Sequence, residues 1–359
     1  MYAINSRRIN SIDIVRGLVV FLSIVLIYLP DKYPGINVHA KWYGFSFIDI
    51  IFPAFVTIFG TSMAIAYHKG VKKKRLAART LKLLLFGLLF NMIVNWNLDI
   101  HTIRLTGVLQ LFAVVGLLAV LVTRFVKKTH HLILVSILIF LIHGLFLMGN
   151  IFCSGLPQPF CNPSAFIDYY IFGKNHLYVL GEVGYDPEGI PSMFGALGNA
   201  LLGFVAGKII LQKKSIGPKL YAYASLLFVL CVISLYFIPM AKRLWTPSFG
   251  FWTAGITVLM LATCYVLFEK ADNLGETTKW TLGFFIAFGR NSFLLYFGKY
   301  LLNSLLAHVQ IFNQSILSHI MDFLHHFYPY DSILYMILIV GFITFVAIWC
   351  HKREWYVRV

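Results

Sequence analysis

Long apolar segments recur along the whole chain, and they constrain its fold more than any other feature. A helix needs about 20 mostly apolar residues to cross a bilayer. Only 12% of the 359 residues are charged, about half the share in a soluble domain, so a soluble fold is excluded. The apolar runs predict membrane-spanning helices over residues 11–29, 47–68, 80–96, 105–123, 132–148, 191–211, 220–239, 249–268, 283–305 and 332–350.

These segments predict an all-α fold: a polytopic membrane helical bundle of about ten transmembrane helices, formed by a single domain over residues 1–359. The first run follows Arg7 and Arg8 and lacks a small-residue cleavage site, so it is interpreted as a span and not as a signal peptide. The longest connection, about 149–190, is expected to be a large extracytoplasmic loop, and long ordered loops usually carry function.

The basic residues predict how the bundle is oriented. If all ten runs cross, one side carries 21 lysines and arginines and the other carries six, which include Lys242 and Arg243. The positive-inside rule then places both termini in the cytoplasm. The net charge of +16 is explained by this topology, so no nucleic-acid partner is expected. The short connections indicate a bacterial protein, whose membrane would be the cytoplasmic (inner) one.

The five cysteines show no metal-ligand spacing, and no metal site is expected. Three of them lie in apolar runs, where a thiol behaves as a small hydrophobe. Cys153 and Cys161 lie in the long outward connection. They form either a disulfide, if that compartment is oxidising, or two free thiols if it is reducing.

Few ionisable residues lie in or beside the spans, where each is paired, interfacial or functional. Asp13 and Arg16 are three residues apart on one helix face and can pair. Asp49 follows Ser46 at the spacing of a capping box, which is a sufficient structural explanation. His39 lies in the outward loop between the first two runs, where an imidazole can act as a general base or merely anchor the interface.

Several motifs, in the same order along the chain, resemble the heparan-α-glucosaminide N-acetyltransferases and their bacterial relatives, a family of multi-span membrane acetyltransferases. The first span resembles the family's Asp-x-x-Arg-Gly opening. The next loop resembles its His-Ala-x-Trp-x-Gly element, followed by an Asp-x-x-Phe-Pro element. The matching segments are Asp13–Gly17, His39–Gly44, Asp49–Pro53, Arg104–Gln110, His176–Tyr178, Asp186–Gly189, Leu244–Ser248 and Asn291–Ser292.

The resemblance implies transfer of an acetyl group from cytosolic acetyl-CoA to a glucosamine-type sugar amine on the extracytoplasmic side, where the active site would open. His39 occupies the position of the family's catalytic histidine. The expected cofactor-binding residues are Arg16, Arg104, Arg290, Asn291 and Lys299, and the expected acceptor-binding residues are Asp49, His176, Asp186 and Glu188. The expected partners are a sugar or glycan acceptor, acetyl-CoA and the lipid bilayer, and a homodimer stays open.

Two departures from the family's sequence pattern bear on the identity of the acceptor and on how the protein binds the charged groups of the cofactor. Relatives often have an asparagine near the outer end of the first helix, where this chain reads Leu26–Pro30. They also have an arginine where this chain has Leu111. Three alternatives remain: an O-acyltransferase acting on a cell-envelope glycan or lipid, a small-molecule transporter, and an inactive membrane scaffold. The transporter is disfavoured because paired broken helices and several midspan charges are not evident in the sequence.

Overall fold

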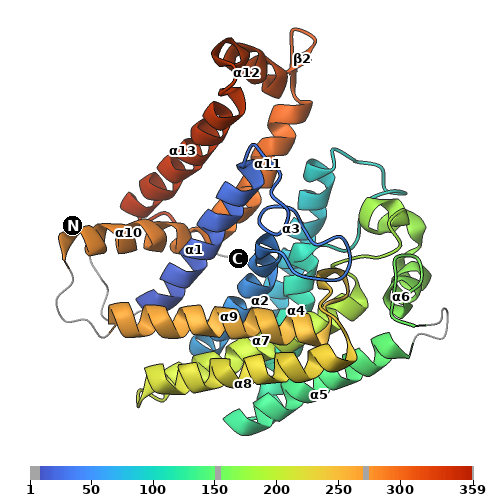
Figure 1. The fold of residues 1–359 in the computed structure, drawn as a ribbon, viewed down its shortest axis with the longest axis vertical. Coiled ribbons are helices and arrows are strands. Elements are labelled where there is room, and N and C mark those ends of the chain that lie inside the picture. The colour runs from blue at the N-terminus through green and yellow to red at the C-terminus, as the bar shows by residue number, and fades with distance from the viewer. Residues whose placement is uncertain (1–8, 150–154, 270–274, 358–359) are drawn as a thin grey trace.

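The computed structural model describes residues 9–149, 155–269 and 275–357, and these are almost entirely helical (Figure 1). The long helices are α1 (Asn10–Tyr28), α2 (Ile51–Ala66), α3 (Lys73–Val94), α4 (Val108–Phe125), α5 (Thr129–Met148), α7 (Ile190–Leu211), α8 (Ile216–Phe237), α9 (Pro247–Cys264), α10 (Glu276–Arg290), α11 (Ser292–His308) and α13 (Asp331–Lys352). Two shorter helices are α6 (Pro163–Phe172) and α12 (Ile316–Leu324).

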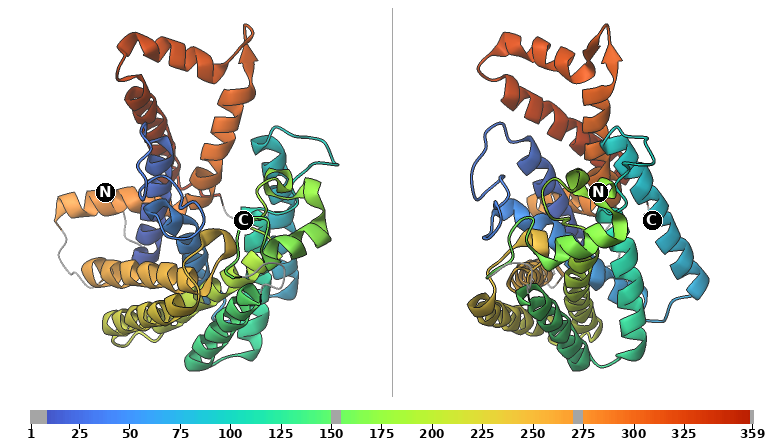
Figure 2. Two further views of the ribbon diagram at one scale, coloured as in Figure 1. Left: turned by 45° about the vertical axis from the view of Figure 1, so that its right-hand side comes forward. Right: turned by 90° about the vertical axis from the view of Figure 1, so that its right-hand side faces the viewer.

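Short turns and one hairpin complete the described chain. The tight helical turns are η1 (Phe47–Ile50), η2 (Lys174–His176), η3 (Tyr178–Gly181), η4 (Lys242–Leu244) and η6 (His325–Phe327), and η5 (Tyr265–Glu269) extends α9 as a π-helical turn. Strands β1 (Gln310–Ile311) and β2 (Gln314–Ser315) pair antiparallel. With α12, this hairpin joins α11 to α13 at the end of the molecule farthest from α5 and α8 (Figures 1 and 2).

Nine helical segments of the described chain are long and apolar enough to span a membrane, which confirms the predicted all-α membrane bundle. They are α1, η1 with α2, α3, α4, α5, α7, α8, α9 with η5, and α13. The run predicted as one span over 283–305 is instead two helices, α10 and α11, which diverge in Figure 1. The backbone of Asn291 between them has φ −106° and ψ 21°, which redirects the chain within a continuously apolar sequence.

Glycines let α10 cross closely over the start of α1. A Cβ at Gly17 would lie 1.9 Å from the carbonyl oxygen of Phe285, and a Cβ at Gly289 would lie 1.9 Å from that of Asp13. Membrane helices associate through such small residues, because backbone contact replaces the hydrophobic driving force that lipid removes. The same contact holds Arg16 and Arg290 near each other.

The core of the bundle lies where α7 packs between α2 and α9. A Cβ at Gly60 on α2 would lie 1.9 Å from the carbonyl oxygen of Ala200 on α7, so the two backbones nearly touch. The buried Asn199 of α7 donates to Thr253 on α9 (3.2 Å) and accepts from the Trp245 indole (2.8 Å). These contacts fix the connection between α8 and α9, which contributes to the site below.

The helix directions divide the connections between two ends of the bundle. The α1–α2 connection, α6, η2, η3 and the α8–α9 connection lie at one end, where α1 finishes and α2 begins. The α2–α3, α4–α5 and α7–α8 connections lie at the opposite end. The first of these ends carries His39, so it is called the His39 end.

Candidate active site

Asp49 is held in place by the turn that opens the second span. Its Oδ2 atom accepts hydrogen bonds from the Ser46 backbone N–H (3.1 Å) and hydroxyl (3.1 Å), which confirms the predicted capping box. The same oxygen accepts from the Ala40 N–H at 3.2 Å. Asp49 is buried, so its other oxygen is fixed toward the α1–α2 loop.

His39 completes a pair with that second oxygen. Its Nδ1 atom lies 2.6 Å from Asp49 Oδ1, a contact that requires a shared proton. An ionised carboxylate has no proton to donate, so the proton is assigned to Nδ1 and Nε2 is left as an acceptor. The His39 side chain is 48% exposed and that of Asp49 is 1% exposed. A buried carboxylate therefore orients an accessible imidazole.

Lys242 is the third member of this cluster, and the sequence reasoning missed it. Its Nζ atom lies 3.2 Å from Asp49 Oδ1 and 3.1 Å from His39 Nδ1. Burial lowers the pKa of Lys242, and the Asp49 carboxylate opposes that shift. In the sequence Lys242 counted only as an outward basic residue. It is separated from His39 by 203 positions, so no local pattern could have paired them.

A cavity of about 350 Å³ opens beside this cluster. It lies between the ends of α1 and α2, the α6–α7 connection, η4 and the middle of α11. Ion-forming groups and tyrosine hydroxyls line much of it. These polar lining residues are Ser23, His39, Tyr178, Tyr185, Glu188, Lys242, Arg243, Tyr296, Lys299 and Tyr300.

Lys299 on α11 places a buried cation in the wall of this cavity. It is 1% exposed, and its Nζ atom donates to the Ser23 carbonyl (2.8 Å) and hydroxyl (2.9 Å) on α1. The ammonium also lies 4.7 Å from the Tyr296 ring centre and 5.0 Å from that of Tyr300. None of the carboxylates in the described chain forms an ion pair with it. An ionisable side chain buried without a carboxylate partner is a candidate functional group.

Arg104, Asp186 and Glu188 form a second carboxylate cluster on the other side of the cavity. Arg104 Nη2 donates to Asp186 Oδ1 at 2.8 Å and to Glu188 Oε2 at 2.6 Å. Asp186 Oδ2 accepts from the Thr106 hydroxyl (2.6 Å) and the Tyr178 backbone N–H (2.8 Å). Within this cluster only Glu188 lines the cavity.

His176 and Asp168 connect the large loop to the bundle. The His176 ring bonds the Ile103 carbonyl at 2.7 Å, and the Leu105 N–H donates to the His176 carbonyl at 3.0 Å. Asp168 accepts from the Ile190 N–H at the start of α7 (2.8 Å). Burial raises the pKa of Asp168 to about 8. Neither side chain lines the cavity.

A second cavity of about 260 Å³ lies farther from His39, between α1, α2, α3, α4 and α11. Arg16, Ser62 and Arg79 line it, and it shares Tyr296 with the His39 cavity. The Arg16 guanidinium donates to the Ser62 hydroxyl at 2.6 Å and contacts Asp13 at 3.3 Å, which confirms the predicted pairing of Asp13 and Arg16. The two cavities together follow α11 from the interior of the bundle to His39.

Arg290 and Asn291, also expected near a cofactor, lie beside the second cavity and do not line it. The Arg290 guanidinium contacts Asp13 at 3.7 Å and the Tyr356 hydroxyl at 3.4 Å. Asn291 is fully buried, and its amide has no hydrogen-bond partner among the residues the structure describes. Its neighbour Ser292 does line the cavity.

The cysteines add nothing to this site. Cys231, Cys264 and Cys350 are free thiols in helical segments. Cys153 lies outside the described residues, so the choice between a Cys153–Cys161 disulfide and two free thiols stays open.

Comparisons with known proteins agree on one family. Residues 8–240 match the family described as heparan-alpha-glucosaminide N-acetyltransferase, catalytic. The human heparan-alpha-glucosaminide N-acetyltransferase is 30% identical over an alignment 358 positions long. That alignment covers 81% of this chain and 52% of the human protein. The mouse protein of the same name is 26% identical, over 84% of this chain and 54% of its own length. The chain thus spans about half the length of these relatives, and it belongs to the heparan-alpha-glucosaminide N-acetyltransferase family.

Proposed function

We propose that this protein transfers the acetyl group of cytosolic acetyl-CoA to the amine of a glucosamine-type sugar on the extracytoplasmic side of a membrane. The observation that carries the proposal is the His39–Asp49 pair, whose imidazole lines a cavity at one end of a membrane bundle. Family membership supports acetyl transfer. The charge count of the connections supports an extracytoplasmic position for His39.

Acetyl transfer to an amine requires a general base. A sugar amine attacks the thioester carbonyl, the carbon–sulfur bond breaks, and the nitrogen must lose a proton. In the direct route His39 Nε2 takes that proton and returns it to the departing thiolate. In the two-step route Nε2 attacks the thioester, the carbon–sulfur bond breaks and CoA leaves as its thiolate. The acetyl group then passes from Nε2 to the amine, and the proton that the amine loses neutralises the thiolate. Both routes need Nδ1 protonated and bonded to Asp49, which the 2.6 Å contact between Nδ1 and Asp49 Oδ1 supports.

The remaining cavity groups would bind the reacting molecules. Negative charge develops on the carbonyl oxygen as the nucleophile attacks, and fixed cations stabilise such charge. Lys299 lines the cavity without a carboxylate partner in the described chain, and its ammonium is held by the Ser23 carbonyl and hydroxyl, so we assign it this role. Glu188 is the carboxylate that lines the cavity, and we assign it to the acceptor, with Asp186 and His176 holding its loop in position.

The second cavity is suited to the donor. CoA carries several phosphate groups, which Arg side chains bind well. Arg16 and Arg79 line this cavity, and Tyr296 joins it to the His39 cavity. The unpartnered Asn291 amide adjoins it and offers both a donor and an acceptor. We propose that Arg16, with Arg290 and Asn291 nearby, meets the CoA end of the donor, while Arg104 acts through Glu188.

The test is transfer of radiolabelled acetyl from acetyl-CoA to glucosamine by the purified chain in detergent, with wild type and His39→Ala compared. We expect transfer by the wild type and a loss of roughly 10²–10⁴-fold in the variant, the usual contribution of a general base. Binding of CoA, followed by calorimetry, should survive. Equal activity in both proteins would remove His39 from the chemistry.

An acceptor panel separates the alternatives. Transfer to hydroxyl-bearing glycans or lipids, and none to amines, would reassign the protein as an O-acyltransferase. If neither acceptor class is acetylated, then the acetyltransferase proposal fails, and uptake into proteoliposomes would test the transporter alternative.

A further inference from the structure

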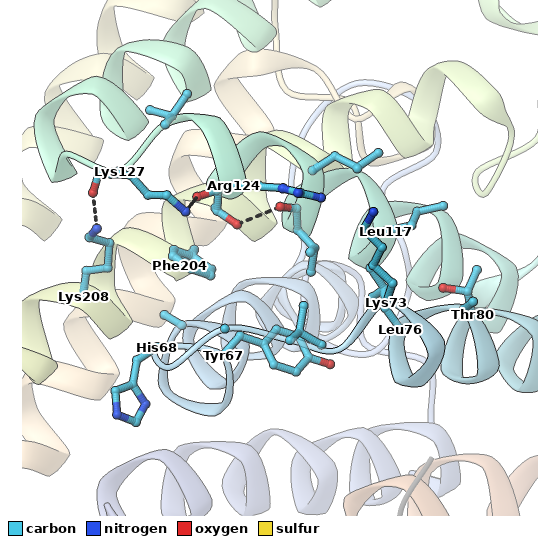
Figure 3. Close-up of a pocket in the computed structure, with 18 of the residues that line it drawn as sticks. Tyr67, His68, Lys73, Leu76, Thr80, Leu117, Arg124, Lys127, Phe204 and Lys208 are labelled. Atoms are coloured by element: carbon cyan, nitrogen blue, oxygen red, sulfur yellow. Dashed lines mark hydrogen bonds between the residues drawn. The ribbon is translucent and has the colours of Figure 1, made fainter.

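A third and larger cavity, of about 1140 Å³, lies at the end of the bundle opposite His39 (Figure 3). It is enclosed by the last turns of α2, α4 and α7 and the first turns of α3. These helix ends mark the level where the bundle meets a membrane surface. The charge count places the cytoplasm at this end.

The deeper walls of this cavity are apolar. They are formed by leucine, valine and phenylalanine side chains from four helices that each meet the length and hydropathy of a membrane span. Several of these side chains are half-buried. Among the apolar lining residues are Leu76, Leu84, Leu117, Val120, Leu121 and Phe204. Hydrocarbon chains fit such a surface, whereas a small ionic ligand leaves it uncovered.

Basic side chains from three helices and one connection line the same cavity. They are Lys73 on α3, Arg124 on α4, Lys127 just after α4, and Lys208 on α7. Lys208 donates to the Lys127 carbonyl, and Lys127 donates to the Thr123 carbonyl at 3.1 Å. Figure 3 shows Lys73 and Arg124 extending toward the same part of the cavity.

No acidic residue belongs to the lining of this cavity. None of the four basic side chains forms an ion pair with a carboxylate in the part of the chain that the structure describes. Topology explains why this end of the bundle is basic, but it does not require the charges to surround a hollow. Lys74 and Arg75, the next two residues of α3, do not line it.

We propose that this cavity binds an anionic glycerophospholipid, with its phosphate near Lys73 and Arg124 and its acyl chains against the apolar wall. The charge of the rim complements a phosphate, and a basic rim above apolar walls between spans is suited to such a lipid. The site is separate from the proposed donor passage. No residue in the described part of the chain lines both this cavity and the second one. Arg79 of the second cavity donates to the hydroxyl of Tyr67, which lines this one, at 2.9 Å, and this bond lies between the two linings.

The test is native mass spectrometry of the full chain in detergent, titrated with phosphatidylglycerol or with phosphatidylcholine of the same acyl chains. We expect selective binding of phosphatidylglycerol. The double variant Lys73→Gln, Arg124→Gln should weaken that binding by at least about tenfold, because each basic group near an anionic headgroup contributes several-fold. The matched control Lys74→Gln, Arg75→Gln removes the same charge on the same side and should change binding by less than about twofold.

A filled cavity tests the apolar half of the site. Leu121→Trp keeps every charge and adds bulk to the wall, so it should reduce phosphatidylglycerol binding without affecting the control lipid. Equal losses in the two charge variants, equal binding of both lipids, or unchanged binding in Leu121→Trp would each overturn the proposal. Displacement of the lipid by CoA would also overturn it and assign the basic rim to the nucleotide.

Discussion

Two buried carboxylate clusters face the His39 cavity, and they differ in what their partners leave exposed. Asp186 accepts hydrogen bonds from Arg104, Thr106, Tyr178 and the Glu188 backbone N–H. The first two of these bonds connect the large loop to the segment that precedes α4. Asp49 has four hydrogen-bonding contacts besides its ion pair with Lys242, and one of the four is with an imidazole whose side chain is 48% exposed. The first cluster holds a loop, and the second holds an accessible imidazole.

The difference shows that two buried ion pairs beside one cavity can leave different side chains accessible. Both clusters join a carboxylate to a cation from a distant part of the chain, Arg104 to Asp186 across 82 positions and Lys242 to Asp49. The clusters differ because the Asp49 cluster includes a titratable side chain, that of His39, which is 48% exposed. Each of the following changes probes one side of this comparison.

The largest effect is expected from Asp49→Asn. An amide oxygen is a weaker partner for the Nδ1 proton, and an amide N–H stabilises the opposite tautomer, with the proton on Nε2. We expect kcat for acetyl transfer to fall by roughly 10²–10⁴-fold while the thermal midpoint changes little. Ser46→Ala, which removes one cap hydrogen bond and keeps the carboxylate, is the control. Full activity in Asp49→Asn would deny Asp49 any role in orienting His39.

Arg104→Met tests the structural cluster. It leaves two buried carboxylates without their cation, and breaking a buried ion pair in this way costs about 3–5 kcal/mol. We expect a lowered unfolding midpoint in detergent, measured by thermal denaturation, and a raised KM for the acceptor because Arg104 holds Glu188, with kcat lost only as the fold is lost. Arg243→Met, whose guanidinium bonds and stacks on Tyr185, should cost about 1 kcal/mol or less. A stable but inactive Arg104→Met protein would move Arg104 into the chemistry.

Lys242→Gln sharpens the catalytic side. Its ammonium lies 3.2 Å from Asp49 Oδ1, the oxygen that also contacts the His39 ring, so its removal takes away one of the groups that hold this carboxylate in place. We expect kcat to fall about tenfold, with little change in the KM for acetyl-CoA. Lys242→Arg should restore most of the activity. Full activity in Lys242→Gln would make Lys242 only a packing residue.

The smallest effect on activity is expected from Asp168→Asn, beside the structural cluster. Burial raises the pKa of Asp168 to about 8, so the folded chain holds a proton that the unfolded chain releases near its ordinary pKa. This residue therefore lowers stability progressively as pH rises from about 4 to 8. The amide variant should gain thermal stability over wild type as pH rises through this range, and the gain should level off above pH 8. The exposed Asp322→Asn is the control, and a gain independent of pH would contradict the assignment.

Much of the architecture follows from hydropathy alone. The apolar runs predicted the nine segments of the described chain that can span a membrane. A segment buried in lipid forms a helix because the helix satisfies its backbone hydrogen bonds internally. The same reasoning failed at 283–305. Hydropathy does not show where an apolar segment changes direction. The change of direction at Asn291 lies next to Gly289, which packs against the backbone of α1.

The site was only partly predictable. His39 and Asp49 lie ten positions apart on one loop and its following turn, so motif and spacing could indicate them together. Lys242 could not be paired with them, because its approach depends on the α8–α9 connection, which Trp245 and Asn199 fix from inside the bundle. His176 and Arg104 were expected to bind ligands, and these expectations stay predictions; in the structure His176 bonds the Ile103 carbonyl and Arg104 bonds Asp186.

The sequence by itself determined that the chain is a helical membrane protein with a histidine in the loop between its first two spans, since hydropathy and local spacing are properties of contiguous residues. The tertiary structure decided which charges meet. A buried charge is stabilised only by groups that packing brings within a few ångströms, and here those groups come from residues up to 203 positions away. The same holds for the basic cavity, whose four cations are brought together only by the ends of separate helices.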